Sequence, residues 1–197
     1  MLLNPEAGDH PATDDPTELA AAMRASNRSF ERFPYYHWRY GERGRRFGGS
    51  DGAWLLWLCG RPSEFAKNQI RWLGGVLSSR GMPTLLLEEH LRILHEELER
   101  ASEYRLLKSC ADDLHARRRR IVSDRSLERL SARFLDTAPE PWRSRVPEMG
   151  RLLAAAVADE RNGIERAVIS IEEWACDSER FPKGWIEAVR TTIAAAR

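Results

Sequence analysis

Leucines recur at helical spacing between residues 84 and 122, and this stretch constrains the fold more than any other part of the sequence. Steps of four and three place on one side of a helix the residues Leu87, Leu91, Leu94 and Leu98. From Ala101 to Tyr104 the step is three where four is expected, which shifts the phase of the pattern. Because no glycine or proline interrupts the stretch, it predicts one long central amphipathic helix over about 84–122, with a bend near Ser102 or a division into two helices as the alternative.

The rest of the chain shows the same period, interrupted at prolines, glycines and capping residues. Further helices are expected from Pro16 to before Pro34, from Ser50 to Cys59, from Ser63 to about Ser79, from Ser123 to before Thr137, from Trp142 to before Asn162 with Pro147 as a start or kink, from Ile164 to Cys176, and after Pro182. The helix after Ser63 is expected to bury Phe65, Ile70, Leu73, Val76 and Leu77. No segment has the alternating pattern of a strand, so the fold class is all-α, a multi-helix bundle without a sheet.

The chain is expected to hold one domain. Residues 1–16 are rich in proline and acidic side chains and lack apolar periodicity, which predicts a disordered N-terminal tail. Residues 17–197 are expected to form a single helical domain. A chain of 197 residues buries enough surface to fold without disulfides or a structural metal, so the sequence requires no cofactor.

The sequence also predicts a cytoplasmic location. The longest strongly apolar run is 54–59, far shorter than the ~20 residues that a membrane-spanning helix needs, so no membrane insertion is expected. The N-terminus lacks the basic and apolar regions of a secretory signal. Cys59, Cys110 and Cys176 lie far apart and outside any metal-binding spacing, which favours reduced thiols. The excess of Arg over Lys among the 31 basic residues is typical of a GC-rich bacterial genome.

The most unusual segment covers 35–51, where five aromatic residues, four arginines and four glycines precede the helix expected at Ser50. A glycine-rich approach to a helix N-terminus exposes backbone N–H groups, and nearby guanidinium groups can hold a phosphate or carboxylate. The candidate ligand-binding residues there are Trp38, Arg39, Tyr40, Arg43, Arg45 and Arg46. The alternative is that the aromatic rings pack in an irregular loop and the arginines are solvated.

Two histidines of the long predicted helix, His90 and His95, are further ligand candidates. A spacing of five places them roughly 140° apart around the helix, so they cannot easily bind one metal ion, and no metal site is predicted. Each borders the leucine stripe, which is typical of structural histidines. The alternative is that one of them is an axial haem ligand. No combination of residues matches a familiar hydrolase or nucleotide-hydrolysing motif, which favours a protein without catalytic activity.

Charge is segmented although the formal net charge is only +1. Residues 24–46 and 117–133 each carry seven arginines against two acidic residues, whereas 84–103 carry six glutamates against two arginines. Such segments can pair within the chain, with a second copy, or with an acidic partner. Tryptophans are expected in the core, and any that is exposed would indicate an interface.

These features favour a non-enzymatic helical interaction or regulatory module that associates with itself through the long helix, or with another protein. The first alternative is a bundle that binds haem, another tetrapyrrole or an organic anion. The second is nucleic-acid binding through the basic segments, which predicts strong salt dependence.

Overall fold

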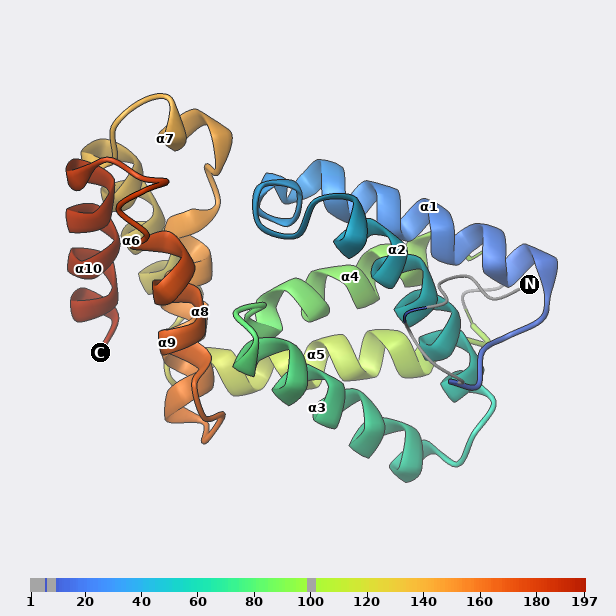
Figure 1. Ribbon diagram of the computed structural model, residues 1–197. Coiled ribbons are helices and arrows are strands. Elements are labelled where there is room, and N and C mark those ends of the chain that lie inside the picture. The colour runs from blue at the N-terminus through green and yellow to red at the C-terminus, as the bar shows by residue number, and fades with distance from the viewer. Residues whose placement is uncertain (1–5, 7–9, 99–101) are drawn as a thin grey trace. The chain divides into compact units, whose positions relative to one another are not determined.

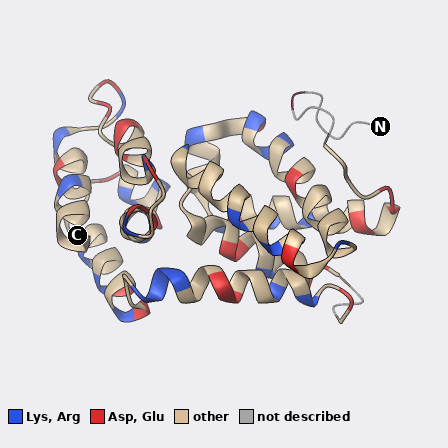
Figure 2. Cartoon of the chain, turned by 90° about the horizontal axis from the view of Figure 1, so that it is seen from below, with Lys and Arg blue, Asp and Glu red and all other residues tan. Residues whose placement is uncertain are grey.

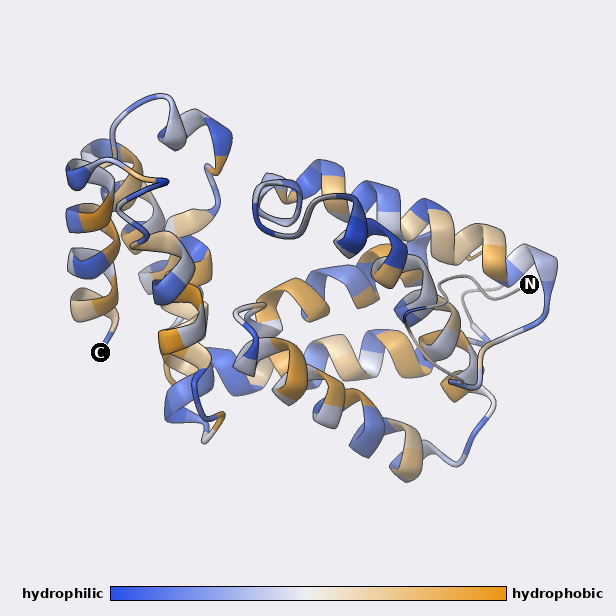
Figure 3. Cartoon of the chain, viewed as in Figure 1, coloured by the Kyte–Doolittle hydropathy of each residue, from blue (hydrophilic) through white to orange (hydrophobic). Residues whose placement is uncertain are grey.

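The computed structural model describes residues 6, 10–98 and 102–197, and within them it contains ten helices and no strand (Figure 1). The helices are α1 (Pro16–Arg32), α2 (Pro34–Cys59), α3 (Ser63–Ser79), α4 (Thr84–Glu96), α5 (Arg105–Arg119), α6 (Asp124–Thr137), α7 (Trp142–Arg145), α8 (Met149–Arg161), α9 (Ala167–Ala175) and α10 (Lys183–Ala196). The predicted all-α class is confirmed. Along the helices, hydrophobic and hydrophilic residues alternate, as amphipathic packing requires (Figure 3).

The chain divides into two compact units. The N-terminal unit comprises Met1–Trp72 and Glu88–Asp113, and the C-terminal unit comprises Leu73–Leu87 and Leu114–Arg197. Each division between the units falls within a helix, namely α3, α4 or α5. The single domain expected over 17–197 stays a prediction. Of the tail expected over 1–16, residues 1–5 and 7–9 lie outside the described part of the chain.

The first helix of the N-terminal unit begins and ends where the sequence predicts. The Asp15 carboxylate accepts hydrogen bonds from the backbone N–H groups of Thr17 (2.7 Å) and Glu18 (3.2 Å), which would otherwise lack helical partners. Pro16 occupies the first turn, where its missing N–H costs nothing. At the other end, α1 ends at Arg32 and Pro34 begins α2.

Small residues let α1 and α2 approach closely. A Cβ at Gly48 would lie 2.6 Å from Ser26 Oγ, and one at Gly52 would lie 3.1 Å from Ala22 Cβ. Because Gly48 and Gly52 are four residues apart, they share one face of α2, and Ala22 and Ser26 share the facing side of α1. The absence of side chains at these two positions therefore sets the spacing of the helix pair.

The long helix predicted over 84–122 is instead two helices. α4 ends at Glu96, α5 begins at Arg105, and residues 97–98 and 102–104 between them are not helical. The break coincides with the shift in the leucine pattern, although Ala101, where that shift begins, lies outside the described residues. A straight helix would turn one half of the stripe away from the core. Since the chain breaks, Leu94 on α4 and Leu107 on α5 are both fully buried.

In the C-terminal unit, α8 packs against α6, α9 and α10. Its residues from Leu152 to Ala158 are completely buried, most of them alanines that permit close packing. The next residue, Asp159, accepts hydrogen bonds from Ser78 Oγ (2.7 Å), the Thr84 backbone N–H (2.7 Å) and Thr84 Oγ1 (2.5 Å). One buried carboxylate thus joins the end of α3 and the start of α4 to α8.

Aromatic residues fill one end of the C-terminal unit. The Trp185 ring stacks on Phe181 at 5.3 Å between centroids and meets the edge of Phe134 at 5.0 Å. Trp142 and Trp174 each contact the Phe181 ring, at 4.5 Å and 5.0 Å. The buried indole N–H of Trp185 donates to the Ala175 carbonyl oxygen. Trp185 therefore belongs to the core, as predicted, and Trp142 and Trp174 are half-buried beside it.

Candidate functional site

The segment over 35–51 is helical, which corrects the irregular loop predicted there. α2 begins at Pro34 and continues to Cys59 with one break at Gly41, whose backbone has φ 55° and ψ −148°. Glycine adopts that conformation without the strain that a Cβ would cause. The glycines after the break do not mark a loop, since those at 48 and 52 allow contact with α1. Ser50 therefore lies within a helix rather than at its start.

The four arginines of this segment diverge rather than forming one clamp. Arg39 donates to the Tyr35 hydroxyl (2.6 Å), and its guanidinium lies 5.3 Å from the centroid of the Tyr40 ring. Arg45 donates to Asn27 on α1 (3.0 Å). Arg43 and Arg46 lie three residues apart on the same side of α2.

Arg43 and Arg46 hold an acidic residue of the chain itself. The Glu6 carboxylate accepts from Arg43 Nε at 2.7 Å and from Arg46 Nη2 at 3.0 Å, and these hydrogen bonds lower the pKa of Glu6. Trp38 packs edge to face with His37, and burial raises the pKa of Tyr40. Binding of an external anion by these residues stays a prediction.

The two candidate histidines lie in different surroundings. His90 is buried, its Nδ1 forms a hydrogen bond with Ser29 Oγ (2.9 Å), and burial lowers its pKa to about 4. Its imidazole is therefore neutral at pH 7. His95 is partly exposed at the end of α4. The described residues contain no group of three or more side chains suited to a metal ion. The assignment of either histidine as a haem ligand stays a prediction.

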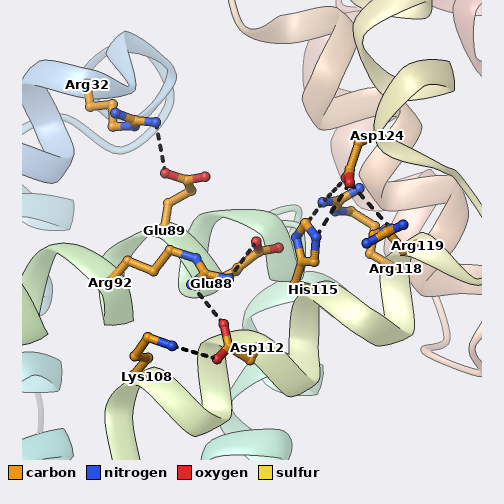
Figure 4. A network of polar contacts seen from close by, with 10 residues as sticks. All are labelled: Arg32, Glu88, Glu89, Arg92, Lys108, Asp112, His115, Arg118, Arg119 and Asp124. Carbon is orange, nitrogen blue, oxygen red and sulfur yellow. Dashed lines mark hydrogen bonds and ion pairs between the residues drawn. The ribbon is translucent and has the colours of Figure 1, made fainter. Parts of the chain in front are cut away.

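The first basic segment is paired within the N-terminal unit. Arg24 and Arg28 on α1 both contact the Glu97 carboxylate, at 2.7 and 2.6 Å. Arg32 contacts Glu89 on α4 at 3.0 Å (Figure 4). Several arginines of the first basic segment thus form ion pairs with glutamates of the acidic stretch that begins in α4. Of the three possibilities that the sequence raises for these charged segments, this is pairing within the chain.

A second set of ion pairs joins α4 to α5. Arg92 lies 2.9 Å from Asp112 and 3.6 Å from Glu88, and Lys108 reaches the other oxygen of Asp112 at 3.3 Å (Figure 4). All four residues belong to the N-terminal unit. Only the Arg92–Asp112 pair crosses from α4 to α5, so it helps to hold the two helices together, and the other two pairs each lie within one helix.

Within the C-terminal unit, Asp124 at the start of α6 collects charges from the end of α5. Arg118 and Arg119 contact its two carboxylate oxygens at 3.0 and 3.4 Å, and His115 Nε2 lies 3.5 Å away (Figure 4). Arg118 is almost fully buried, so this ion pair is a structural one. Acidic and basic residues are interspersed along most helices (Figure 2).

Two exposed aromatic side chains lie on α3. Trp72 has an exposed fraction of 58% and Phe65 one of 47%, and Trp72 is the only exposed tryptophan among the residues that the structure describes. Seven residues separate them, which places both on one side of the helix. The sequence prediction that Phe65 is buried is wrong, because Ala66 occupies the inward position instead.

We call this side the α3 outer face and define it as Phe65, Asn68, Gln69 and Trp72. Its polar members are neutral, and charged residues lie along one edge. There Glu64 contacts Lys67 at 3.1 Å, and Arg71 donates to Asp113 at 3.1 Å and to Asn68 at 3.0 Å. An aromatic patch with a charged rim is the usual composition of a protein interface.

The residues of the leucine stripe of α4 and α5 are buried. Self-association through that stripe stays a prediction, and it would require the core to open. No described helix combines the length and apolarity needed to cross a membrane.

No protein-family model, characterised protein or solved structure matches the chain.

Proposed function

We propose that this chain is a non-enzymatic, cytosolic helical interaction module that forms a homodimer through the α3 outer face. The observation that carries the proposal is the exposure of Phe65 and Trp72 on one side of α3. Isolated exposed apolar residues are common, but an exposed tryptophan beside an exposed phenylalanine is typical of an interface.

The arrangement is complementary to itself. In an antiparallel pair of α3 helices with the twofold axis between positions 68 and 69, Phe65 of each copy faces Trp72 of the other. Glu64 and Arg71 lie on the same edge of the face, so twofold symmetry brings Glu64 of one copy opposite Arg71 of the other, about 3 Å apart along the axis. Two opposite-charge pairs would then flank two aromatic pairs.

The small area predicts a weak dimer. Full aromatic side chains bury about 150–250 Å², so the exposed fractions leave roughly 200 Å² of aromatic surface per copy. Stable interfaces bury about 800 Å² per partner. We therefore expect a dissociation constant above about 1 μM.

Sedimentation velocity across protein concentration tests this proposal. The sedimentation coefficient of the natural chain should rise with concentration, and Phe65→Ser combined with Trp72→Ser should abolish the rise. Ile169→Ser is the matched control, since Ile169 has an exposed fraction of 48% on α9. A concentration-independent monomer, or an equal effect of the control, would refute the proposal.

Charge reversal tests the register. Glu64→Arg and Arg71→Glu should each weaken self-association, because like charges then meet across the axis. An equimolar mixture of the two variants should associate again, since each variant carries the charges that the other lacks. If the mixture stays monomeric while the natural chain dimerises, the antiparallel register is wrong.

A further inference from the structure

Three arginines form a row on the outer side of α6. Arg125, Arg129 and Arg133 are exposed and follow one another at intervals of four residues. This spacing advances about 6 Å and turns about 40° per step, so the three guanidinium groups project within one third of the circumference. The buried side of the helix, with Leu127, Leu130, Ser131 and Phe134, lies opposite. We call these three residues the α6 arginine row.

The side chains of the α6 arginine row have no ion-pair or hydrogen-bond partner among the residues that the structure describes. Arg133 accepts a hydrogen bond from Thr137 Oγ1 only through its backbone carbonyl oxygen. Two of the three neighbouring acidic residues have other partners: Asp124 pairs with Arg118 and Arg119, and Glu128 contacts Arg151 at 3.4 Å. The third, exposed Asp136, forms no ion pair with a described residue, so the outer side of α6 keeps a net positive charge. Three concentrated positive charges are therefore available to an external anion.

A row of the same spacing elsewhere in the chain provides a comparison. Arg24, Arg28 and Arg32 on α1 also step by four, but each contacts glutamates on or just after α4. That row borders a buried apolar contact, since Phe30 and Ala25 on α1 are in the core. The α6 arginine row is bordered instead by exposed Glu128, Ala132 and Asp136.

This difference distinguishes two kinds of anionic partner. An acidic protein surface would be expected to add an apolar centre to the contact, and the outer side of α6 offers none. A nucleic-acid backbone is contacted largely through charge and hydrogen bonds, without apolar side chains. The row also lacks an aromatic ring on which an unpaired base could stack, which favours a duplex over a single strand.

We propose that the α6 arginine row binds the phosphodiester backbone of double-stranded DNA without reading its sequence. Guanidinium groups bind phosphate oxygens in a bidentate manner, and arginine is suited to this geometry. The row is about 12 Å long, and one strand of a duplex carries a phosphate every ~3.4 Å, so three arginines can each reach a phosphate of one strand. This site is independent of the homodimer proposed through α3.

The test is fluorescence anisotropy of a labelled mixed-sequence DNA duplex, titrated with the full chain over a series of salt concentrations. Three neutralised phosphates predict a slope of about −2.7 in log affinity against log salt concentration, which is roughly a 40-fold loss of affinity between 50 and 200 mM salt. Replacing Arg125, Arg129 and Arg133 together by Gln should abolish most binding at 50 mM salt.

The matched control removes the same charge from other exposed positions of the C-terminal unit, by replacing Arg161, Lys183 and Arg197 together with Gln. It should keep the affinity and the slope of the natural chain, and circular dichroism should show that both triple variants are folded. An equal loss in the control, an absence of binding by the natural chain at 50 mM salt, or tighter binding of poly-glutamate than of the duplex would overturn the proposal. The last result would favour an acidic protein partner instead.

Discussion

Asp51 and His90, two titratable groups of the N-terminal unit, should give its stability opposite dependences on pH. Burial raises the pKa of half-buried Asp51 on α2 from 3.8 to about 6, and burial lowers the pKa of His90 on α4 from 6.5 to about 4. The Asp51 carboxylate has no ion pair or hydrogen bond to compensate within the described residues. Both shifts act between pH 4 and 6.5.

The signs follow from which state binds the proton. As pH falls through 6.5, the unfolded chain protonates His90 while the folded chain does not, so folding is weakened until pH reaches about 4. As pH falls through 6, the folded chain protonates Asp51 while the unfolded chain stays ionised, so folding is strengthened down to about pH 4. The two effects oppose one another in the same pH range.

One pKa unit corresponds to 1.36 kcal/mol, and each group is only partly titrated at a given pH. Acidification from pH 7 to 5 should therefore lower the free energy of unfolding by about 2 kcal/mol through His90 and raise it by about 1 kcal/mol through Asp51. Relative to the natural chain, Asp51→Asn should therefore lose about 1 kcal/mol more stability over this range. His90→Gln should lose about 2 kcal/mol less.

Urea unfolding followed by circular dichroism at pH 7 and pH 5 measures these differences, and comparison with the natural chain cancels the groups that the variants share. The double variant should show the sum of the two effects, a net gain of about 1 kcal/mol or less on acidification relative to the natural chain, if the groups titrate independently. If Asp51→Asn and the natural chain respond identically to pH, the argument from burial is wrong.

Three further predictions concern stability and reactivity. Gly48→Ala should destabilise the chain by about 1–3 kcal/mol in urea unfolding, because the added Cβ would lie 2.6 Å from Ser26 Oγ. The control Gly75→Ala should stabilise the chain by up to about 1 kcal/mol, because no atom lies within 4 Å of its added Cβ. Asp159→Ala should lower the free energy of unfolding by about 3 kcal/mol or more, because the Thr84 N–H and the Ser78 hydroxyl lose a buried acceptor. The control Asp136→Ala, at an exposed position, should change the free energy of unfolding by less than about 0.5 kcal/mol. Equal effects of the two variants would contradict a stabilising role for the Asp159 hydrogen bonds. Burial raises the pKa of the Cys110 thiol to about 11, so little reactive thiolate is present at pH 8. Alkylation of Cys110 by iodoacetamide at pH 8, measured by mass spectrometry, should be about 100-fold slower in the folded chain than in urea. Comparable rates would show that the thiol is accessible.

The sequence predicts most helix boundaries because local chemistry decides them. Pro34 ends α1, and the Ser123 hydroxyl accepts from the Ser126 N–H at the start of α6, as its capping role requires. The break between α4 and α5 was also visible as a shift in the leucine pattern. The absence of glycine and proline nevertheless favoured one continuous helix.

Features that depend on a distant partner were not predictable. Glycines weaken an isolated helix, and only the presence of Ala22 and Ser26 on α1 explains why Gly48 and Gly52 suit α2. Phe65 and Ala66 differ by one position, so the periodic pattern alone did not show which of them faces inward. The arginine rows of α1 and α6 have the same spacing, and only the position of α4 distinguishes the paired row from the unpaired one.

The division of each unit into two separate stretches has a consequence during synthesis. Because the N-terminal unit includes Glu88–Asp113, its contacts cannot be completed when α3 has emerged from the ribosome. About 35 more residues must follow, which takes roughly 2–7 s at ordinary rates of translation. During that interval, Ser29 on α1 lacks its hydrogen-bond partner His90, and Arg32 lacks its ion-pair partner Glu89. The N-terminal unit of the nascent chain is therefore exposed to aggregation between the synthesis of residues 79 and 113.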